Sequence, residues 1–100
     1  MSRRVLRYLP QARAEYREQR AYYKALDPRL RVPFEAAIRR AEDLALGNPE
    51  GFAYIIGSKR IRAVILRRFP YRLLYVVQGN DVVVVALAHT ARDPGQFQKR

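Results

Sequence analysis

The stretch RLLYVVQGNDVVVVALA, residues 72–88, decides the fold of this chain. Two apolar runs, 72–78 and 81–88, flank the dipeptide Gly79-Asn80, which is a strong signal for a two-residue hairpin turn. The second run holds four consecutive valines, so a strand there presents apolar side chains on both faces. Strands of that kind lie at the centre of a sheet or are covered on both sides. The stretch therefore predicts an antiparallel pair whose second strand is central.

Two more strands are predicted outside this hairpin. Residues 61–67 are β-like and are joined to it by a tight connection at 68–70. Residues 3–8 alternate loosely between basic and apolar side chains, which is the period of a short strand. Residues 51–58 contain glycine and are predicted to be a loop.

Two amphipathic helices are predicted between the first strand and that loop. The first begins near Pro10, and the second begins after Asp27-Pro28, because Asp is a good N-cap and Pro suits the first turn. The second ends at Gly47, where Asn48-Pro49 prevents continuation. So short a turn between them predicts an antiparallel hairpin. The apolar face of the first helix is formed by Leu9, Ala12, Tyr16, Tyr23 and Leu26.

The sum is an α+β fold, with an N-terminal strand and an antiparallel helical hairpin packed on an antiparallel sheet of about four strands. A chain of 100 residues fits one domain over residues 1–100. The tail from Thr90 to Arg100 is expected to add a helical turn after Asp93-Pro94. We expect the second face of the sheet to be partly apolar and to need a partner.

The charge balance indicates a polyanionic or acidic partner. Twenty basic residues against nine acidic ones give a net charge of +11, and such a field attracts nucleic acid, the ribosome or an acidic protein. A well-solvated, Arg-rich surface is the alternative interpretation. With no cysteine and a single histidine, neither a disulfide scaffold nor a Cys or multi-His metal site is expected. We expect no cofactor.

No membrane association is expected either. No run approaches the roughly 18 apolar residues that span a bilayer. The basic start at residues 1–5 is followed by no uninterrupted apolar stretch, which argues against a signal peptide. The reducing cytoplasm is the expected compartment.

The densest basic segment, residues 59–72, is the candidate surface for a target or nucleic acid. Arginine forks bind phosphate bidentately and tyrosine stacks on bases, which favours a contact with RNA or DNA. The alternative is an exposed strand face whose neighbouring aromatic residues belong to the core. The candidate residues are Lys59, Arg60, Arg62, Arg67, Arg68, Tyr71 and Arg72, with Tyr75 beside them.

His89 is the one side chain that titrates near neutral pH without help. A metal-independent ribonuclease needs a base, an acid and cations for the phosphate, and His89 with Arg68 or Arg92 could supply parts of that set. The alternative is that His89 holds the C-terminal segment by a hydrogen bond, because one histidine supplies only one of two proton-transfer groups. The sequence holds no glycine-rich phosphate loop and no serine in a nucleophile elbow.

Four segments, taken in their order along the chain, together resemble one family. The most specific is residues 68–75, RFPYRLLY, and the last is HTARDP at 89–94 followed by Phe97 and Arg100. With Ala12–Tyr23 and the GNPEG break at 47–51, they are similar to the RelE/ParE toxin superfamily of type II toxin–antitoxin systems. The similarity covers nearly the whole chain and is closest to ParE-like plasmid stabilisation proteins.

The resemblance implies a toxin that a cognate antitoxin wraps and neutralises. ParE-like members interfere with DNA gyrase, and RelE-like members cut mRNA in the ribosome. The first alternative is a non-enzymatic gyrase inhibitor. The second is an mRNA endoribonuclease, in which Arg68, Tyr75, His89 and Arg92 would be the catalytic candidates. A third is a binding module without toxicity. A homodimer and a toxin–antitoxin hetero-oligomer both stay open as assemblies.

Overall fold

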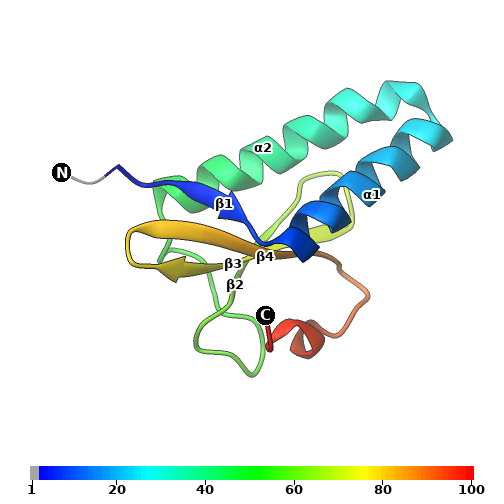
Figure 1. Cartoon of the computed structure of the whole chain (residues 1–100). Helices are drawn as coiled ribbons and strands as arrows, with labels where there is room; N and C mark the ends of the chain where they lie inside the picture. Colours follow the sequence, from blue (N-terminus) through cyan, green and yellow to red (C-terminus); the bar gives the residue numbers. More distant parts are fainter. Residues whose placement is uncertain (1–2) are drawn as a thin grey trace.

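The computed structural model describes residues 3–100, with two helices over one face of a sheet and a short turn on the other (Figure 1). The strands are β1 (Leu6–Tyr8), β2 (Arg62–Ile65), β3 (Tyr71–Gln78) and β4 (Asp81–His89). The helices are α1 (Pro10–Leu26) and α2 (Arg31–Gly47), and two short 3-10 turns are η1 (Pro28–Leu30) and η2 (Pro94–Phe97). The predicted strand–helix–helix–three-strand order is confirmed. No helix between residues 3 and 100 is long and apolar enough to cross a membrane.

The helical hairpin is held to the sheet by a cluster of aromatic rings. The Tyr16 ring stacks on Phe34 with centroids 6.1 Å apart, and the Tyr23 ring lies 5.1 Å from Phe34. Phe34 in turn meets Phe69, which precedes β3, edge-to-face at 5.2 Å. Such pairs stabilise a core beyond the burial of their area. The turn between the helices is fixed by the Asp27 carboxylate, which accepts a hydrogen bond from the following turn.

The sheet is mixed, with strand order β1-β4-β3-β2. β3 pairs antiparallel with β2 and β4, as the predicted hairpin requires, whereas β1 pairs in parallel with β4. The prediction of a wholly antiparallel sheet was therefore wrong for the first strand. The helical hairpin is a crossover that makes β1 and β2 parallel. After two reversals of direction β4 runs the same way as β2, and so the same way as β1.

The central strand, β4, contains a bulge at Val85. Val84 and Ala86 pair with adjacent residues of β3, so Val85 has no partner across that ladder. An extra residue of this kind reverses the alternation of the strand. Val84 and Leu87 therefore contact the core under the helices, while Val85 and Ala86 both contact the core on the opposite face.

The second face of the sheet is covered by segments of this same chain. Ile55 and Ile61, from the extended segment after α2, and Phe97, from η2, pack on it and are buried. Figure 1 shows both segments on the side of the sheet that the helices leave free. The expectation that this face needs a partner was wrong, because the predicted loop and tail fold back under it.

Beyond the end of β1, two charged side chains form hydrogen bonds with backbone groups on the free edge of β4. The Glu15 Oε1 accepts a hydrogen bond from the backbone N–H of Leu87 at 3.1 Å. The Arg100 Nη1 donates to the Val85 carbonyl at 3.0 Å and to the same Glu15 oxygen at 2.9 Å. The pair stands in for the missing neighbour strand and anchors the C-terminal segment.

Candidate target-binding site at one end of the sheet

A cleft of about 410 Å3 opens between α1 and the end of β4. It brings together three of the side chains predicted from sequence, Tyr71, His89 and Arg92, with polar residues of the first helix. This convergence of groups that are distant in sequence makes it the candidate site. The lining residues are Glu15, Glu18, Gln19, Tyr71, Leu87, His89, Ala91 and Arg92.

His89 lies at the last position of β4 and is exposed. Its Nδ1 accepts a hydrogen bond from the backbone N–H of Ala91 at 3.0 Å. A neutral imidazole with an accepting Nδ1 carries its proton on Nε2, so the free nitrogen is a donor. The ring also meets the Tyr71 ring edge-to-face at 5.3 Å. His89 is thus prepared to donate to a bound acceptor, and this contact also ties it to the turn that follows, as the structural alternative predicted.

Tyr71 forms the inner wall of the cleft. Its side chain is buried, and its hydroxyl donates to Gln19 Oε1 at 2.6 Å. Burial, followed by a hydrogen bond with Tyr23, raises the pKa of Tyr71 above its ordinary value. Tyr71 therefore stays neutral and orients the Gln19 amide. It provides no ionised base at neutral pH.

Glu18 is the residue of this cleft that sequence reasoning missed. Glu18 comes from α1, far from His89 in the sequence, and is exposed. The signal available was the helix period, which sets Glu15 and Glu18 on one flank of α1 and Arg13, Arg17 and Arg20 on another. The neighbouring Glu15 is already engaged with Leu87 and Arg100.

Arg67 and Arg68 lie at the same end of the sheet, in the β2–β3 connection. This connection adjoins the cleft because Tyr71 pairs with His89 across β3 and β4. Arg68 has a φ of 74°, the left-handed region, and within residues 3–100 it makes no hydrogen bond or ion pair. A non-glycine residue held there costs on the order of 1 kcal/mol, and such strain gathers at functional sites.

The basic segment 59–72 does not form one surface. Lys59, Arg60 and Arg62 line a separate groove of about 250 Å3 with Glu50, Tyr54 and Val77. Arg60 donates to the Gln98 carbonyl, and Arg62 donates to the carbonyls of Glu50 and Phe52. The Arg62 guanidinium also lies 4.0 Å from the centroid of the Tyr54 ring. These two arginines hold the chain together, which leaves Arg67 and Arg68 as the exposed pair beside the cleft.

The remaining candidates lie away from the cleft. Tyr75 is 0% exposed, and its hydroxyl donates to the Pro49 carbonyl. It therefore supports the end of α2 and is out of reach of a substrate. Arg72 pairs with Ala88, whose side chain belongs to the second face of the sheet. Of the four catalytic candidates, the structure places only His89 and Arg92 in one cleft.

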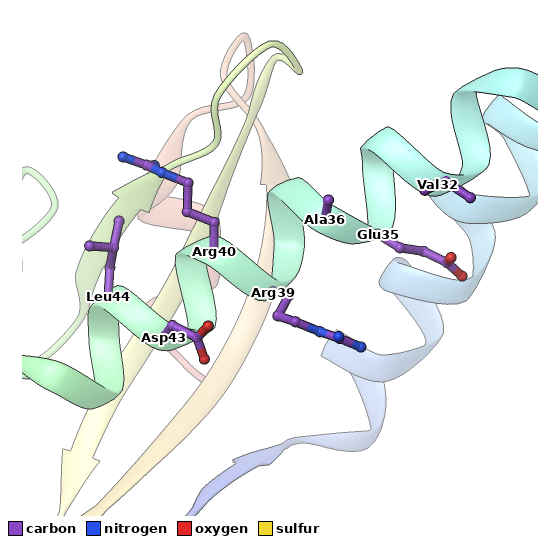
Figure 2. Close-up of a pocket in the computed structure, with 7 residues that line it drawn as sticks. All are labelled: Val32, Glu35, Ala36, Arg39, Arg40, Asp43 and Leu44. Atoms are coloured by element: carbon purple, nitrogen blue, oxygen red, sulfur yellow. The ribbon is translucent and has the colours of Figure 1, made fainter.

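A second hollow, of about 550 Å3, follows the solvent side of α2 (Figure 2). Its apolar contribution comes from Val32, which is 61% exposed, and from Ala36 and Leu44. Figure 2 shows Arg40 and Leu44 on one side of the helix, and Glu35 and Arg39 on the other. The hollow is larger than the cleft beside His89, but it is an amphipathic surface along a single helix, and its charged side chains are two arginines and two carboxylates.

The sequence matches the family described as the ParE toxin of the type II toxin–antitoxin system parDE, over residues 6–94. No curated protein matches it. Among solved structures, the chromosomal ParDE toxin–antitoxin system of P. aeruginosa is similar, with a TM-score of 0.72 and 16% identity. That similarity covers 85% of this chain and 94% of the other, and it supports the fold. The chain belongs to the ParE toxin family of type II toxin–antitoxin systems, and a cognate antitoxin is its implied partner.

Proposed function

We propose that this toxin acts by binding DNA gyrase. The target-binding surface would be formed by the cleft beside His89 and by the adjoining β2–β3 connection with Arg67 and Arg68. Membership of the ParE family supports gyrase as the target. The observation that supports this surface is Arg68, which has a left-handed backbone and no hydrogen bond or ion pair within residues 3–100, in the connection that adjoins the cleft with His89 and Arg92. Arginine is enriched among the residues that dominate binding energy at protein interfaces.

The geometry favours binding over RNA cleavage. The accepting Nδ1 of His89 leaves its Nε2 protonated in the neutral ring, so that nitrogen is a poor general base. Tyr75 is buried, and Arg68 is not among the residues that line the cleft. The N–H donors of His89 and Arg92 suit recognition of carbonyl and carboxylate groups on a protein.

One observation supports the ribonuclease alternative. Glu18 and His89 line the same cleft, with Arg92 beside them. A carboxylate base, an imidazolium acid and a cation for the phosphate are the groups that metal-independent cleavage requires. In that mechanism Glu18 would take the 2′-hydroxyl proton and His89 would protonate the leaving oxygen.

A supercoiling assay with purified gyrase tests the proposal. We expect the wild-type toxin to inhibit supercoiling, and the Arg68→Ala/Arg92→Ala variant to need at least about tenfold more protein, since two interface arginines are lost. The matched control is Arg3→Ala/Lys99→Ala, which removes the same charge elsewhere. Unimpaired supercoiling at saturating wild-type toxin would refute the proposal.

A parallel assay, which measures the integrity of a reporter mRNA on translating ribosomes, separates the two functions. A gyrase inhibitor leaves the mRNA intact. Cleavage by the wild type that both Glu18→Gln and His89→Gln abolish would establish the ribonuclease instead. Inhibition of supercoiling that survives both substitutions would support a surface whose binding energy comes from the arginines.

We further propose that the antitoxin places an amphipathic helix in the hollow along α2. Val32, Ala36 and Leu44 follow one another along α2 at spacings of four and eight residues, and two arginines and two carboxylates line the same hollow. The Val32→Ser/Leu44→Ser variant should bind the antitoxin at least about tenfold more weakly. The control, Ile56→Ser/Ile65→Ser, removes two apolar side chains elsewhere that are at least as exposed as Val32 and Leu44. Equal affinity of both variants would place the antitoxin on another surface.

We infer that residues 1–100 act as one toxin domain in the cytoplasm, where gyrase and the ribosome are found. Phe97 and Ile61 cover part of the second face of the sheet, which reduces the apolar surface that a homodimer could use there. The exposed apolar residues of α2 favour assembly with the antitoxin. Mass measurement of the toxin alone and of the complex decides between a homodimer and a hetero-oligomer.

A further inference from the structure

A stripe of four cations runs along α1, away from the cleft. Arg13, Arg17, Arg20 and Lys24 follow one another at spacings of four, three and four residues. At 3.6 residues per turn these positions lie on one side of the helix, and at 1.5 Å per residue they span about 16 Å. The stripe is thus a straight row of positive charge on a rigid element.

Aromatic rings hold two of these cations in place. The Arg13 guanidinium lies 5.1 Å from the centroid of the Tyr8 ring, and that of Arg20 lies 5.6 Å from the Tyr16 ring. Such contacts orient a guanidinium while leaving its N–H donors available. Arg17 and Lys24 are exposed and, within residues 3–100, have no hydrogen bond or ion pair. Their charges are therefore uncompensated.

The stripe borders a groove of about 540 Å3 between the end of α1 and the start of α2. Arg17, Arg20, Lys24 and Arg31 line it, together with Ala21 and the single carboxylate of Glu35. Glu35 is shared by two of these cations, at 3.6 Å from Arg20 and 3.0 Å from Arg31. Four positive charges thus face one negative charge.

The lining of this groove selects among anionic partners. An amphipathic protein helix needs apolar anchors, and in the part of the chain that the structure describes the groove offers only Ala21. Single-stranded nucleic acid needs exposed aromatic platforms, whereas Tyr8 and Tyr16 are half-buried and lie beneath arginines. Contacts to a duplex backbone need only cations in a regular row. Over about 16 Å of its axis, duplex DNA presents roughly nine phosphates, more than the stripe can neutralise.

We propose that the α1 stripe binds the phosphate backbone of duplex DNA without sequence preference. This proposal does not rest on gyrase as the target, although a toxin that also contacts DNA would be retained where a DNA-bound enzyme works. The stripe and the cleft lie on different flanks of α1, so the two partners can be bound together.

The test is binding of the free toxin to a fluorescent random-sequence DNA duplex, measured by anisotropy over a range of salt concentrations. The Arg17→Ala/Lys24→Ala variant removes two cations that have no hydrogen bond or ion pair among the described residues, so its fold should persist, as circular dichroism will check. Each lost contact lowers the slope of log K against log salt by about 0.9. The variant should therefore lose about 1.8 in slope and bind about 60-fold more weakly at 0.1 M salt.

Arg3→Ala/Lys99→Ala is the matched control, and it should keep the slope of the wild type. Equal slopes for the stripe variant and the wild type would overturn the proposal. So would tighter binding of single-stranded RNA than of the duplex, or a loss of antitoxin affinity in the stripe variant while DNA binding is unchanged. None of these measurements contains gyrase, so failure here is distinct from failure in the supercoiling assay.

Discussion

Replacing Glu15 with alanine tests whether two side chains stand in for a missing strand. Glu15 Oε1 accepts hydrogen bonds from the Leu87 N–H and from Arg100. The side chains of this ion pair are largely buried, at 20% exposure for Glu15 and 24% for Arg100. The substitution leaves the N–H of the buried residue Leu87 without a partner. It also frees Arg100 from the carboxylate while the Val85 carbonyl remains available to it.

The two losses set the magnitude. An unsatisfied buried N–H costs about 1–3 kcal/mol, and a partly exposed ion pair contributes up to about 1 kcal/mol. Since water can reach this edge in part, we expect Glu15→Ala to lower the free energy of unfolding by about 2 kcal/mol. For a domain of this size that corresponds to a fall in Tm of roughly 8–16 °C.

Urea denaturation followed by circular dichroism measures the change, with an unchanged m value showing that the native and denatured states stay comparable. Glu15→Gln keeps an acceptor oxygen for Leu87 and should lose less than half as much. Glu18→Ala, one turn away and exposed, should stay within about 0.5 kcal/mol of the wild type. If Glu15→Ala were no less stable than Glu18→Ala, the pair of Glu15 and Arg100 would not replace a neighbour strand of β4.

Three further outcomes follow from other contacts. Tyr75→Phe loses the hydrogen bond to the Pro49 carbonyl and should cost about 1 kcal/mol in urea denaturation, with target inhibition unchanged because the side chain is buried. Arg68→Gly relieves the left-handed backbone and should raise the free energy of unfolding by about 1 kcal/mol while weakening gyrase inhibition. Burial, and next the hydrogen bond to Glu42, raises the pKa of Tyr8. That stabilisation is present below the unfolded-state pKa of about 10 and is lost above it, so urea titrations should show Tyr8→Phe losing less stability than the wild type as pH rises past about 10.

The sequence predicted the elements well because their signals are local. Gly79-Asn80 gave the hairpin, and Asp27-Pro28 gave the break between the helices, at the positions that the structure shows. The direction of β1 was not predicted, because a parallel pairing with β4 depends on a partner more than seventy residues away. The bulge at Val85 was also hidden, since four consecutive valines look the same with or without an extra residue.

The candidate site was predicted only where its signals are local in the sequence. His89 and Arg92 lie on one short turn, so their proximity could be read from sequence. Glu18 reaches them only because α1 crosses the end of β4, which is a property of packing. The segment 59–72 was predicted to form one basic surface, but Arg60 and Arg62 donate hydrogen bonds to backbone carbonyls elsewhere in the chain. No local sequence pattern predicts these hydrogen bonds.

The net charge of +11 therefore has more than one explanation. Arg60, Arg62 and Arg100 donate to backbone carbonyls and stabilise the fold. Arg17 and Lys24, on α1, have no such use within residues 3–100. An exposed cation without a partner raises the self-repulsion of a basic protein, so it weakens the folded state slightly unless an anion offsets it. Arg17 and Lys24 lie on α1, whereas Arg68 lies in the β2–β3 connection, so an acidic partner that covers one of these surfaces does not neutralise the other. That separation is the physical reason to test target binding and DNA binding with different variants.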